Sequence, residues 1–430
     1  MSEALRIAVA GLGTVGSGTL LLIQEHGDLI AARCGRPIRL AAVSARDRAK
    51  KRPVDISAAR WFDDPVAMAG DPDIDVVIEL IGGSDGIAKS VIDTAVAAGH
   101  SVITANKALL ATHGTALARA AEAADVTLGY EAAVAGGVPV IKCLREGLAG
   151  NSVTRIYGIL NGTCNYILST MRESGREFAD VLADAQRLGY AEADPGFDVD
   201  GVDTAHKLAI LTALAFGCEV NLAGVHVEGI REVSALDIAY ADELGFRIKL
   251  LGIASRANGG VEQRVYPCMV PADTPIANVE GVFNAVVAEG DFVGTILVEG
   301  RGAGARPTAS AVVADLIDIV RGACMPTFAV PAKDLARLPS LPIEDHVGCH
   351  YVRLMVVDKP GVIADIAAAL RDEEISVEAL LQRARAPGEA VPVVITTHET
   401  RGQSMDNALR RIARLDSVVE PPRRIRIENL

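Results

Sequence analysis

A short acidic stretch holds the residues whose types and spacing best suit chemistry. Five acids fall within twelve positions, and a lysine follows four residues after the last of them: Glu192, Asp194, Asp198, Asp200, Asp203 and Lys207. Several carboxylates can hold a substrate ammonium group, and a lysine beside them can act as a general acid. Hydride transfer to a carbonyl creates an alkoxide, which needs a proton and a nearby positive charge. The mixture therefore favours an active site in which a carbonyl group is reduced to an alcohol or the reverse.

Three structural interpretations of the same stretch compete with this one. Pro195 and Gly196 interrupt any regular helix, so a helix is expected only over residues 203–216, with Asp203 and Lys207 one turn apart. Acids before a helix are ordinary caps, and an Asp–Lys pair at this spacing is an ordinary surface ion pair. A calcium site is the third, although the spacing does not match an EF-hand loop. Spacing alone does not decide among them.

A glycine-rich turn near the start of the chain has the pattern of a dinucleotide-binding loop. Its residues are Gly11, Leu12, Gly13, Thr14, Val15 and Gly16. The first glycine allows the sharp turn, the second lets a phosphate approach the backbone, and the third permits close packing of helix on strand. A turn without a ligand is the alternative, but a strand before the turn and a helix after it favour a cofactor.

Two further segments bear on the cofactor. Arg46 follows the second predicted strand, where it can pair with the 2′-phosphate of NADP, so NADP is favoured. Asp47 keeps NAD as the alternative cofactor. The structural alternative is that the basic residues form a solvated loop that binds no cofactor. Thr104 and Lys107 follow the fourth predicted strand, where ligands bind in a doubly wound sheet, so both are expected near the cofactor and Lys107 near its nicotinamide. The alternative for Lys107 is a surface position at a helix start, where the helix dipole mildly disfavours a cation.

Strand–helix alternation over residues 1–140 predicts an α/β fold, a Rossmann doubly wound parallel sheet that binds a dinucleotide. Strands are expected at residues 6–10, 38–43, 75–81, 101–104 and 126–130, and helices at 15–24, 87–98 and 114–124. Residues 141–321 are expected to form an α+β catalytic and dimerisation domain. Its last helix, near residues 309–320, is expected to pack back on the first domain.

The rest of the chain divides into a connection and a small module. Residues 322–348 contain several prolines and little periodicity, which predicts a linker or a covering segment. Residues 349–430 carry strands and helices in the order βαββαβ, which predicts a separate ferredoxin-like module.

Composition excludes several classes of protein. The formal net charge is −13 and no Lys/Arg-rich block stands out, so nucleic acid and anionic membranes are not expected partners. Seven cysteines without a CxxC pair argue against a zinc site and a disulfide framework. The N-terminus lacks a secretion signal and no apolar run is long enough to span a bilayer, so a cytoplasmic protein is expected.

At the acidic stretch the chain resembles the homoserine dehydrogenases. The residues that carry the resemblance are Ala185, Gly189, Asp194, Pro195, Asp198, Gly201, Asp203 and Lys207. The resemblance covers residues 5–320 and includes the glycine-rich turn, Asn106-Lys107, Asn161-Gly162-Thr163 and Gly302-Ala303-Gly304. Cys164 departs from the family, in which many relatives carry threonine there.

The resemblance implies reversible, NAD(P)H-dependent reduction of L-aspartate 4-semialdehyde to L-homoserine, in threonine, methionine and isoleucine biosynthesis. It implies that Lys207 is the proton donor and that Lys107 lies at the reacting oxygen and the cofactor. Glu192 and Asp203 would bind the substrate amino group, with Asp198 in support. The residues implied to line the cofactor are Gly189, Gly302 and Gly304.

The resemblance also implies a monovalent cation such as sodium, held by the backbone near Glu131, Val134, Gly136 and Val138. The residues alone predict only a strand and a turn in that segment. Asp194 and Asp200 receive no role in the chemistry and are expected to shape the turn.

The last module resembles an ACT domain at Asp358, Pro360 and Gly361, which follow its first strand. This implies control by an amino-acid effector, with threonine the candidate, whereas dimerisation alone is the structural alternative. We expect a homodimer or a homotetramer. Two other functions stay open: a dehydrogenase of another amino-acid semialdehyde, and a catalytically silent regulator that binds NADP and an amino acid. The intact lysines and acids of the site speak against the silent regulator.

Overall fold

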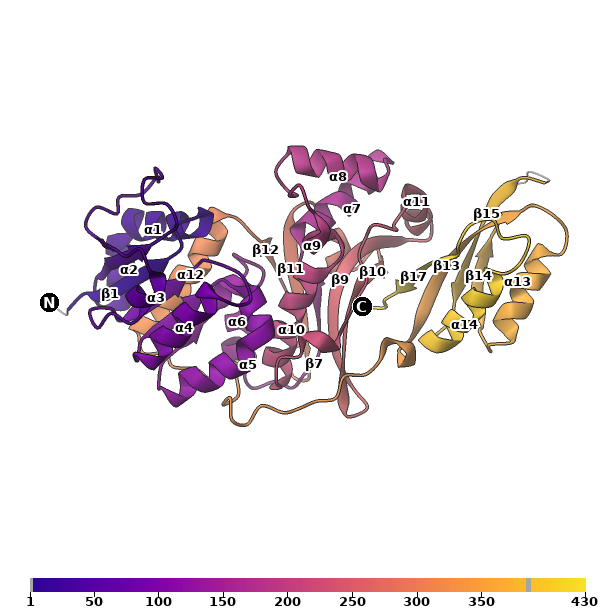
Figure 1. Cartoon of the computed structure of the whole chain (residues 1–430). Coiled ribbons are helices and arrows are strands. Elements are labelled where there is room, and N and C mark those ends of the chain that lie inside the picture. Colours follow the sequence, from indigo (N-terminus) through magenta and orange to yellow (C-terminus); the bar gives the residue numbers. More distant parts are fainter. Residues whose placement is uncertain (1–2, 384–387) are drawn as a thin grey trace.

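The computed structural model describes residues 3–383 and 388–430, which form three units arranged along one axis (Figure 1). A nucleotide-binding unit lies at the N-terminal end, a mixed-sheet unit in the middle, and a C-terminal module at the far end. Within these residues, every helix is too short or too polar to cross a bilayer.

The nucleotide-binding unit is a parallel sheet of six strands in the order β3-β2-β1-β4-β5-β6, which confirms the predicted doubly wound fold. Its strands are β1 (Leu5–Ala10), β2 (Ile38–Ser44), β3 (Arg60–Trp61), β4 (Val76–Glu79), β5 (Ser101–Thr104) and β6 (Leu128–Gly129). Its helices are α1 (Thr14–Glu25), α2 (Gly27–Cys34), α3 (Pro65–Ala69), α4 (Ile87–Ala97) and α5 (Lys107–Ala123). Strand β1 is buried along most of its length because both faces of the sheet are covered.

Helix α5 begins at Lys107, whereas the sequence predicted a start at residue 114. The side chain of Asn106 explains the difference, because its Oδ1 accepts a hydrogen bond from the amide of Leu109, 3.1 Å away, and so caps the helix. The short elements β3, α2 and α3 were not predicted.

The middle unit begins with η1 (Glu131–Ala133), α6 (Val140–Lys142) and η2 (Cys143–Gly147). Its strands are β7 (Val153–Ile159), β8 (Val225–Val227), β9 (Phe246–Ala257), β10 (Gly260–Pro271), β11 (Phe283–Gly290) and β12 (Gly294–Arg301). Its remaining helices are α7 (Gly162–Ser174), α8 (Phe178–Arg187), α9 (Gly196–Val199), α10 (Val202–Phe216), η3 (Leu222–Gly224), α11 (Ala235–Glu243), η4 (Pro275–Asn278) and α12 (Ala305–Val320). Strand β11 was not predicted, and α12 packs against α1 of the nucleotide-binding unit.

The C-terminal module has the predicted βαββαβ order, with one short strand added. It consists of β13 (Val347–Val357), α13 (Val362–Arg371), β14 (Val377–Leu381), β15 (Ala390–Thr397), β16 (Thr400–Arg401), α14 (Gly402–Ile412) and β17 (Arg423–Ile427), after a short η5 (Ile343–Asp345). The module is not separate, because β17 pairs with β13 on one side and with β10 on the other. One sheet therefore runs through both units in the order β12-β11-β7-β9-β10-β17-β13-β15-β14.

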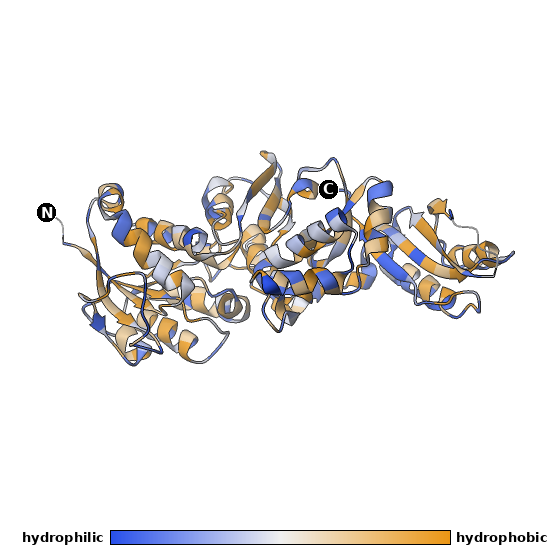
Figure 2. Cartoon of the chain, turned by 90° about the horizontal axis from the view of Figure 1, so that it is seen from above, coloured by the Kyte–Doolittle hydropathy of each residue, from blue (hydrophilic) through white to orange (hydrophobic). Residues whose placement is uncertain are grey.

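The segment before the module covers the surface of the other two units. Its Phe328 is fully buried and its ring lies 5.7 Å from that of Tyr130. Colouring by hydropathy shows apolar residues along the strands and polar residues on the outer helix faces and loops (Figure 2).

Candidate active site

A cleft of about 600 Å³ lies between the nucleotide-binding unit and the middle unit. Residues that line it and were predicted as site residues are Val15, Lys107, Gly136, Gly189, Asp198, Asp203, Lys207, Gly302 and Gly304. The cleft therefore brings together the end of β5, the acidic stretch and the turn before α12.

The glycine-rich turn has the shape of a phosphate cradle. A side chain on Gly16 would bring its Cβ within 2.0 Å of the carbonyl oxygen of Gly11, whereas a Cβ on Gly13 would meet nothing within 4 Å. Gly13 is the N-cap of α1, no side chain caps it, and the first turn carries no acid. The free backbone N–H groups at this helix start thus face open space that a diphosphate fits.

A second cavity of about 350 Å³ adjoins this turn and is basic. It is lined by Gly13 and Thr14 together with Lys50, Lys51, Arg52 and Arg306. Arg46, predicted to meet a 2′-phosphate, is exposed and lines neither cavity. The Asp47 carboxylate accepts hydrogen bonds from the amides of Ala49 and Lys50 at 2.8 and 3.2 Å, so it is engaged within its own loop.

The hydroxyl of Thr104 serves the protein framework. It donates to the buried carboxylate of Glu79 at 2.7 Å and accepts from the amide of Asn106 at 2.9 Å. The other oxygen of Glu79 accepts from the amide of Ile81 at 2.6 Å. Glu79 was not predicted as a site residue, although an acid at the end of an apolar strand was a visible signal. It ties together the ends of β4 and β5, from which Lys107 starts.

Three charged residues form the centre of the cleft. Lys207 donates from Nζ to the carbonyl oxygen of Leu160 at 2.6 Å and to Oδ2 of Asp203 at 2.7 Å. Nζ of Lys107 lies 3.2 Å from Oδ1 of the same carboxylate. Burial by itself would raise the pKa of Asp203, but Lys207 and then Lys107 lower it to about 2. The carboxylate is therefore ionised at neutral pH and shared by two ammonium groups.

Asn161 connects the two carboxylates that face the cleft. Its Nδ2 donates to Asp198 at 2.8 Å and to Asp203 at 2.9 Å, while its Oδ1 accepts from the amide of Cys164 and caps α7. Burial raises the pKa of Asp198 above its usual value. The role of Asn161 was not predicted, although the residue carried part of the family resemblance. Cys164 is buried, and its thiol donates to the backbone oxygen of Asp198.

The remaining acids of the stretch lie outside the cleft. Glu192 is exposed, and its backbone oxygen accepts a hydrogen bond from Gln186. Asp194 accepts from the amide of Gly196 at 3.1 Å, and Asp200 pairs with Arg231. Asp194 thus shapes the turn, as expected, whereas Asp200 is held by Arg231 from outside the turn and Glu192 is not brought to the other substrate-site candidates.

The segment predicted to hold a cation contributes Gly136 to the lining of the cleft. The carboxylate of Glu131 is buried and accepts from the amides of Ile141 and Lys142, both at 2.9 Å. Burial, and then Asp315, raise its pKa to about 7. Gly136 has a φ of +51° and a Cβ there would lie 2.3 Å from the oxygen of Gly302. No group of three His, Cys, Asp or Glu side chains able to hold a metal occurs in residues 3–383 and 388–430.

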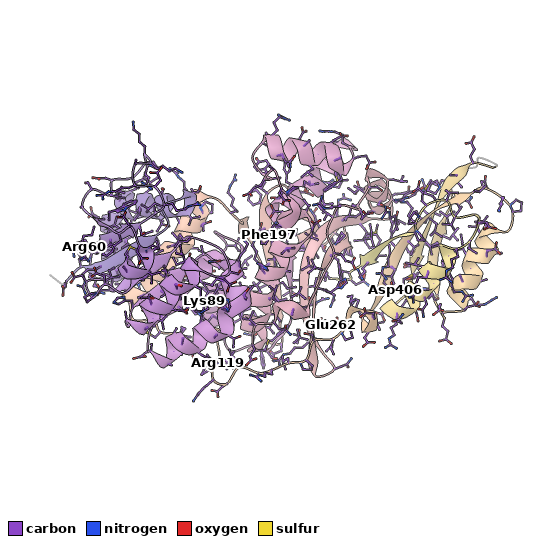
Figure 3. The ribbon with its side chains drawn as sticks, viewed as in Figure 1. Arg60, Lys89, Arg119, Phe197, Glu262 and Asp406 are labelled. Atoms are coloured by element: carbon purple, nitrogen blue, oxygen red, sulfur yellow. The ribbon has the colours of Figure 1, made fainter. Side chains whose placement is uncertain are left out.

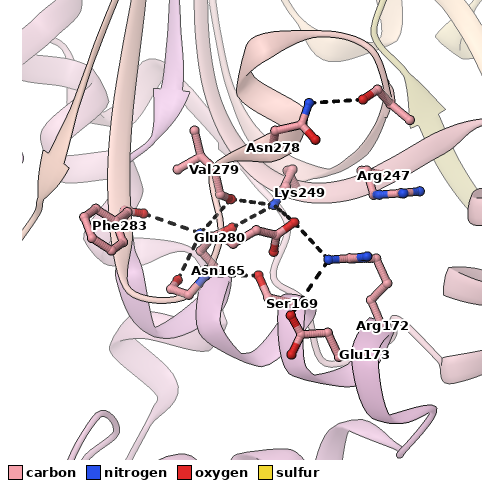
Figure 4. Close-up of polar contacts among 12 residues, drawn as sticks. Asn165, Ser169, Arg172, Glu173, Arg247, Lys249, Asn278, Val279, Glu280 and Phe283 are labelled. Atoms are coloured by element: carbon pink, nitrogen blue, oxygen red, sulfur yellow. Dashed lines mark hydrogen bonds and ion pairs between the residues drawn. The ribbon is translucent and has the colours of Figure 1, made fainter.

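A second buried lysine lies outside the cleft and was not predicted (Figure 4). Lys249 donates from Nζ to the backbone oxygen of Val279 at 2.6 Å, and Glu280 lies 3.6 Å away. Burial lowers the pKa of Lys249 to about 8. The side-chain amide of Asn165 donates to the backbone oxygens of Val279 and Gly281. Lys249 and Asn165 together fasten the segment of residues 279–281 to β9 and α7.

Three family models match consecutive parts of the chain. Residues 11–131 match the NAD-binding domain of homoserine dehydrogenase, residues 139–317 match homoserine dehydrogenase, and residues 350–416 match the ACT domain. The homoserine dehydrogenase of Pseudomonas aeruginosa is 45% identical over 435 residues, with 100% of both chains covered. That of Neisseria gonorrhoeae is 44% identical, with 100% of this chain and 99% of the relative covered. The crystal structure of a homoserine dehydrogenase from Thiobacillus denitrificans matches with a TM-score of 0.93 at 44% identity, with 99% of each chain covered.

Proposed function

The chain belongs to the homoserine dehydrogenase family, and from this premise we propose that it interconverts L-aspartate 4-semialdehyde and L-homoserine in threonine, methionine and isoleucine biosynthesis. The observation that carries the proposal is the pair of lysines on one buried carboxylate, Asp203, inside a cleft that begins at a dinucleotide-binding turn. A nicotinamide cofactor supplies the hydride when it is bound.

We propose that Lys207 donates the proton to the substrate oxygen. A lysine ammonium has three donors, and two of those of Lys207 point to Leu160 and Asp203. The third is free to meet the oxygen on which charge develops. Lys107 would lie beside the same oxygen and stabilise its charge, while Asp203 holds both ammonium groups in place.

Two carboxylates facing the cleft, Asp198 and Asp203, are proposed to bind the substrate ammonium. We also assign Glu192 to this group, which requires the turn of residues 190–195 to move toward the cleft when substrate binds. The substitution Glu192→Gln tests that assignment, since it should raise KM for homoserine with little change in the affinity for the cofactor. An unchanged KM would remove Glu192 from the substrate site.

We propose that NADP is preferred over NAD. The proposal rests on four cations around the second cavity, Lys50, Lys51, Arg52 and Arg306, next to the turn that fits the diphosphate. Asp47, the residue that would favour NAD, is engaged within its loop. Arg46 lines neither cavity but stays a candidate for the 2′-phosphate, whereas Lys50 and Lys51 line the second cavity and would be the more direct phosphate ligands. The ratio of kcat/KM for NADP⁺ and NAD⁺ tests the preference. Thr104 would contribute to the cofactor site indirectly, because its hydrogen bond to Glu79 holds the ends of β4 and β5 together.

A monovalent cation such as sodium is proposed for the backbone of Glu131, Val134, Gly136 and Val138. The ligands of the cation would be carbonyl oxygens alone, because the carboxylate of Glu131 already accepts two amide hydrogen bonds. Carbonyl oxygens suit hard cations. Replacing sodium and potassium by choline in the assay tests this proposal, and activity independent of the cation would reject it.

We further propose that the ACT module binds threonine as an inhibitor and that the enzyme is a homodimer or a homotetramer. Gly361, with a φ of +96°, forms the turn at the start of α13, as in the pattern that suggested the module. Titration of the activity with threonine and light scattering of the purified protein test these two points separately.

Homoserine-dependent reduction of NADP⁺ by the purified protein tests the main proposal. A folded protein without this activity would favour the silent regulator. Activity with a different amino-acid alcohol, and none with homoserine, would favour a dehydrogenase for another semialdehyde.

A further inference from the structure

An aromatic ring of the middle unit meets Lys107 of the nucleotide-binding unit, and none of the roles proposed above accounts for it. Phe197 lies on α9 of the middle unit, and the ammonium nitrogen of Lys107 lies 5.5 Å from the centre of its ring. Figure 3 marks Phe197 on the side of the middle unit that faces the nucleotide-binding unit. The residue is 44% exposed, so core packing does not explain an aromatic side chain at this position.

A second ring supports Phe197 from the side. The ring of His206, on α10, lies 5.4 Å from that of Phe197 with an angle of 76° between the planes, which is a favourable perpendicular arrangement. Burial, and then the charge of Lys107, lower the pKa of His206. His206 is therefore neutral at pH 7 and does not repel the ammonium group.

We infer that Phe197, supported by His206, is a positioning residue for Lys107. This inference rests on the role proposed for Lys107 at the reacting oxygen. Lys107 keeps 32% of its side chain exposed, and the ammonium at the end of its flexible stem forms one ion pair within the described residues, to Asp203. The face of an aromatic ring carries negative charge density and attracts an ammonium within about 6 Å. The ring thus supplies a second attachment, from the opposite unit, and limits the positions that the ammonium can reach.

An aromatic face and mere apolar volume make different predictions at this position. If Phe197 only fills space, a leucine at this position should support normal turnover. If the ring holds the ammonium, a tyrosine should support normal turnover and a leucine should not. Only an aromatic side chain offers a face with negative charge density.

The experiment compares Phe197→Leu and Phe197→Tyr with the wild-type protein in single turnovers of homoserine with NADP⁺. Phe292→Leu is the matched control, since Phe292 is 90% exposed at the turn between β11 and β12. We expect Phe197→Leu to slow the turnover about three- to tenfold, or about 0.7–1.4 kcal/mol at 1.36 kcal/mol per tenfold. KM for homoserine, the dissociation constant for NADP⁺ and the unfolding midpoint should change little. Phe197→Tyr should stay within about twofold of the wild type, and Phe292→Leu should be unchanged.

Equal losses in the leucine and tyrosine variants, or no loss in the leucine variant, would overturn the inference. If Phe197→Leu does not fold, His206→Leu provides the test, because it removes only the supporting ring. A loss of about twofold in its turnover rate supports the inference, and an unchanged rate overturns it. A wild-type protein that does not oxidise homoserine would instead reject the proposed function, so the two failures are distinguishable.

Discussion

Replacement of Lys207 by methionine is the sharpest test of the active centre. The variant keeps the length and the apolar stem of the side chain but loses the ammonium, which donates to Leu160 and Asp203. If Lys207 is the proton donor, kcat should fall by about 10²–10⁴, the range of general acid catalysis. Lys249→Met is a matched control, because Lys249 is also a buried lysine that donates to a backbone oxygen at 2.6 Å. Its kcat should stay within about threefold of the wild type.

The stability of the Lys207→Met variant should show an unusual dependence on pH. In the wild type, the pKa of Asp203 is lowered from 3.8 to about 2. At 1.36 kcal/mol per pKa unit this stabilises the folded protein by about 2 kcal/mol above pH 4, and the contribution is lost as the pH falls toward 2. Without Lys207, burial should dominate and raise the pKa of Asp203 above 3.8. Its contribution then changes sign, because the folded state takes up the proton more readily than the unfolded state.

Unfolding in urea at several pH values measures this change of sign. At pH 7 we expect Lys207→Met to be less stable than the wild type by about 2–4 kcal/mol, somewhat below the usual 3–5 kcal/mol because Lys107 and Asn161 still contact Asp203. The difference should shrink as the pH is lowered from 7 to 4. A kcat within tenfold of the wild type would refute Lys207 as the proton donor. A stability difference that grows on acidification would refute the electrostatic reasoning.

Three further predictions follow from other parts of the molecule. Since the pKa of Lys249 is about 8 when folded and 10.5 when unfolded, the wild type should gain stability from pH 8 to 10 relative to Lys249→Met, as measured by urea unfolding; parallel curves would contradict this. Gly16→Ala should abolish NADPH binding in a fluorescence titration, because its Cβ would lie 2.0 Å from the oxygen of Gly11. Arg353→Met leaves the carboxylate of Asp237 buried without its guanidinium partner, so urea unfolding should show a loss of about 3 kcal/mol, with activity retained when threonine is absent.

The hydrophobic pattern located the helices and strands well in the nucleotide-binding unit, where strands and helices alternate. Strand β5 has the predicted bounds, because it is a short run of residues of which Val102, Ile103 and Thr104 are buried, and it follows a helix that ends before Gly99. Helix α5 and strand β11 were harder. Asn106 caps α5 through its side chain, and β11 pairs with β7 and β12, so tertiary contacts decide where these two elements run.

The active centre was easier to predict than its surroundings. Asp203 and Lys207 are one turn apart on one helix, so their meeting follows from local geometry. The position of Glu192 depends on how the turn of residues 190–195 folds, and the position of Arg46 on how its loop leaves the sheet. The spacing of apolar residues in the sequence predicts neither position. The contact between Phe197 and Lys107 joins two units and was not visible in the spacing of either.

The insertion of β17 between β10 and β13 has a consequence for biosynthesis on the ribosome. The middle unit cannot complete its sheet until the last residues of the chain have been made, because β17 is one of the neighbours of β10. About 150 residues separate the two strands, which at about 5–20 residues per second is on the order of ten to thirty seconds of translation. During that time, part of the edge of β10 offers unpaired backbone groups to any other strand nearby. A nascent chain that stalls or is cut before residue 423 would leave that edge open permanently, so shortened products should aggregate instead of accumulating as active enzyme without regulation.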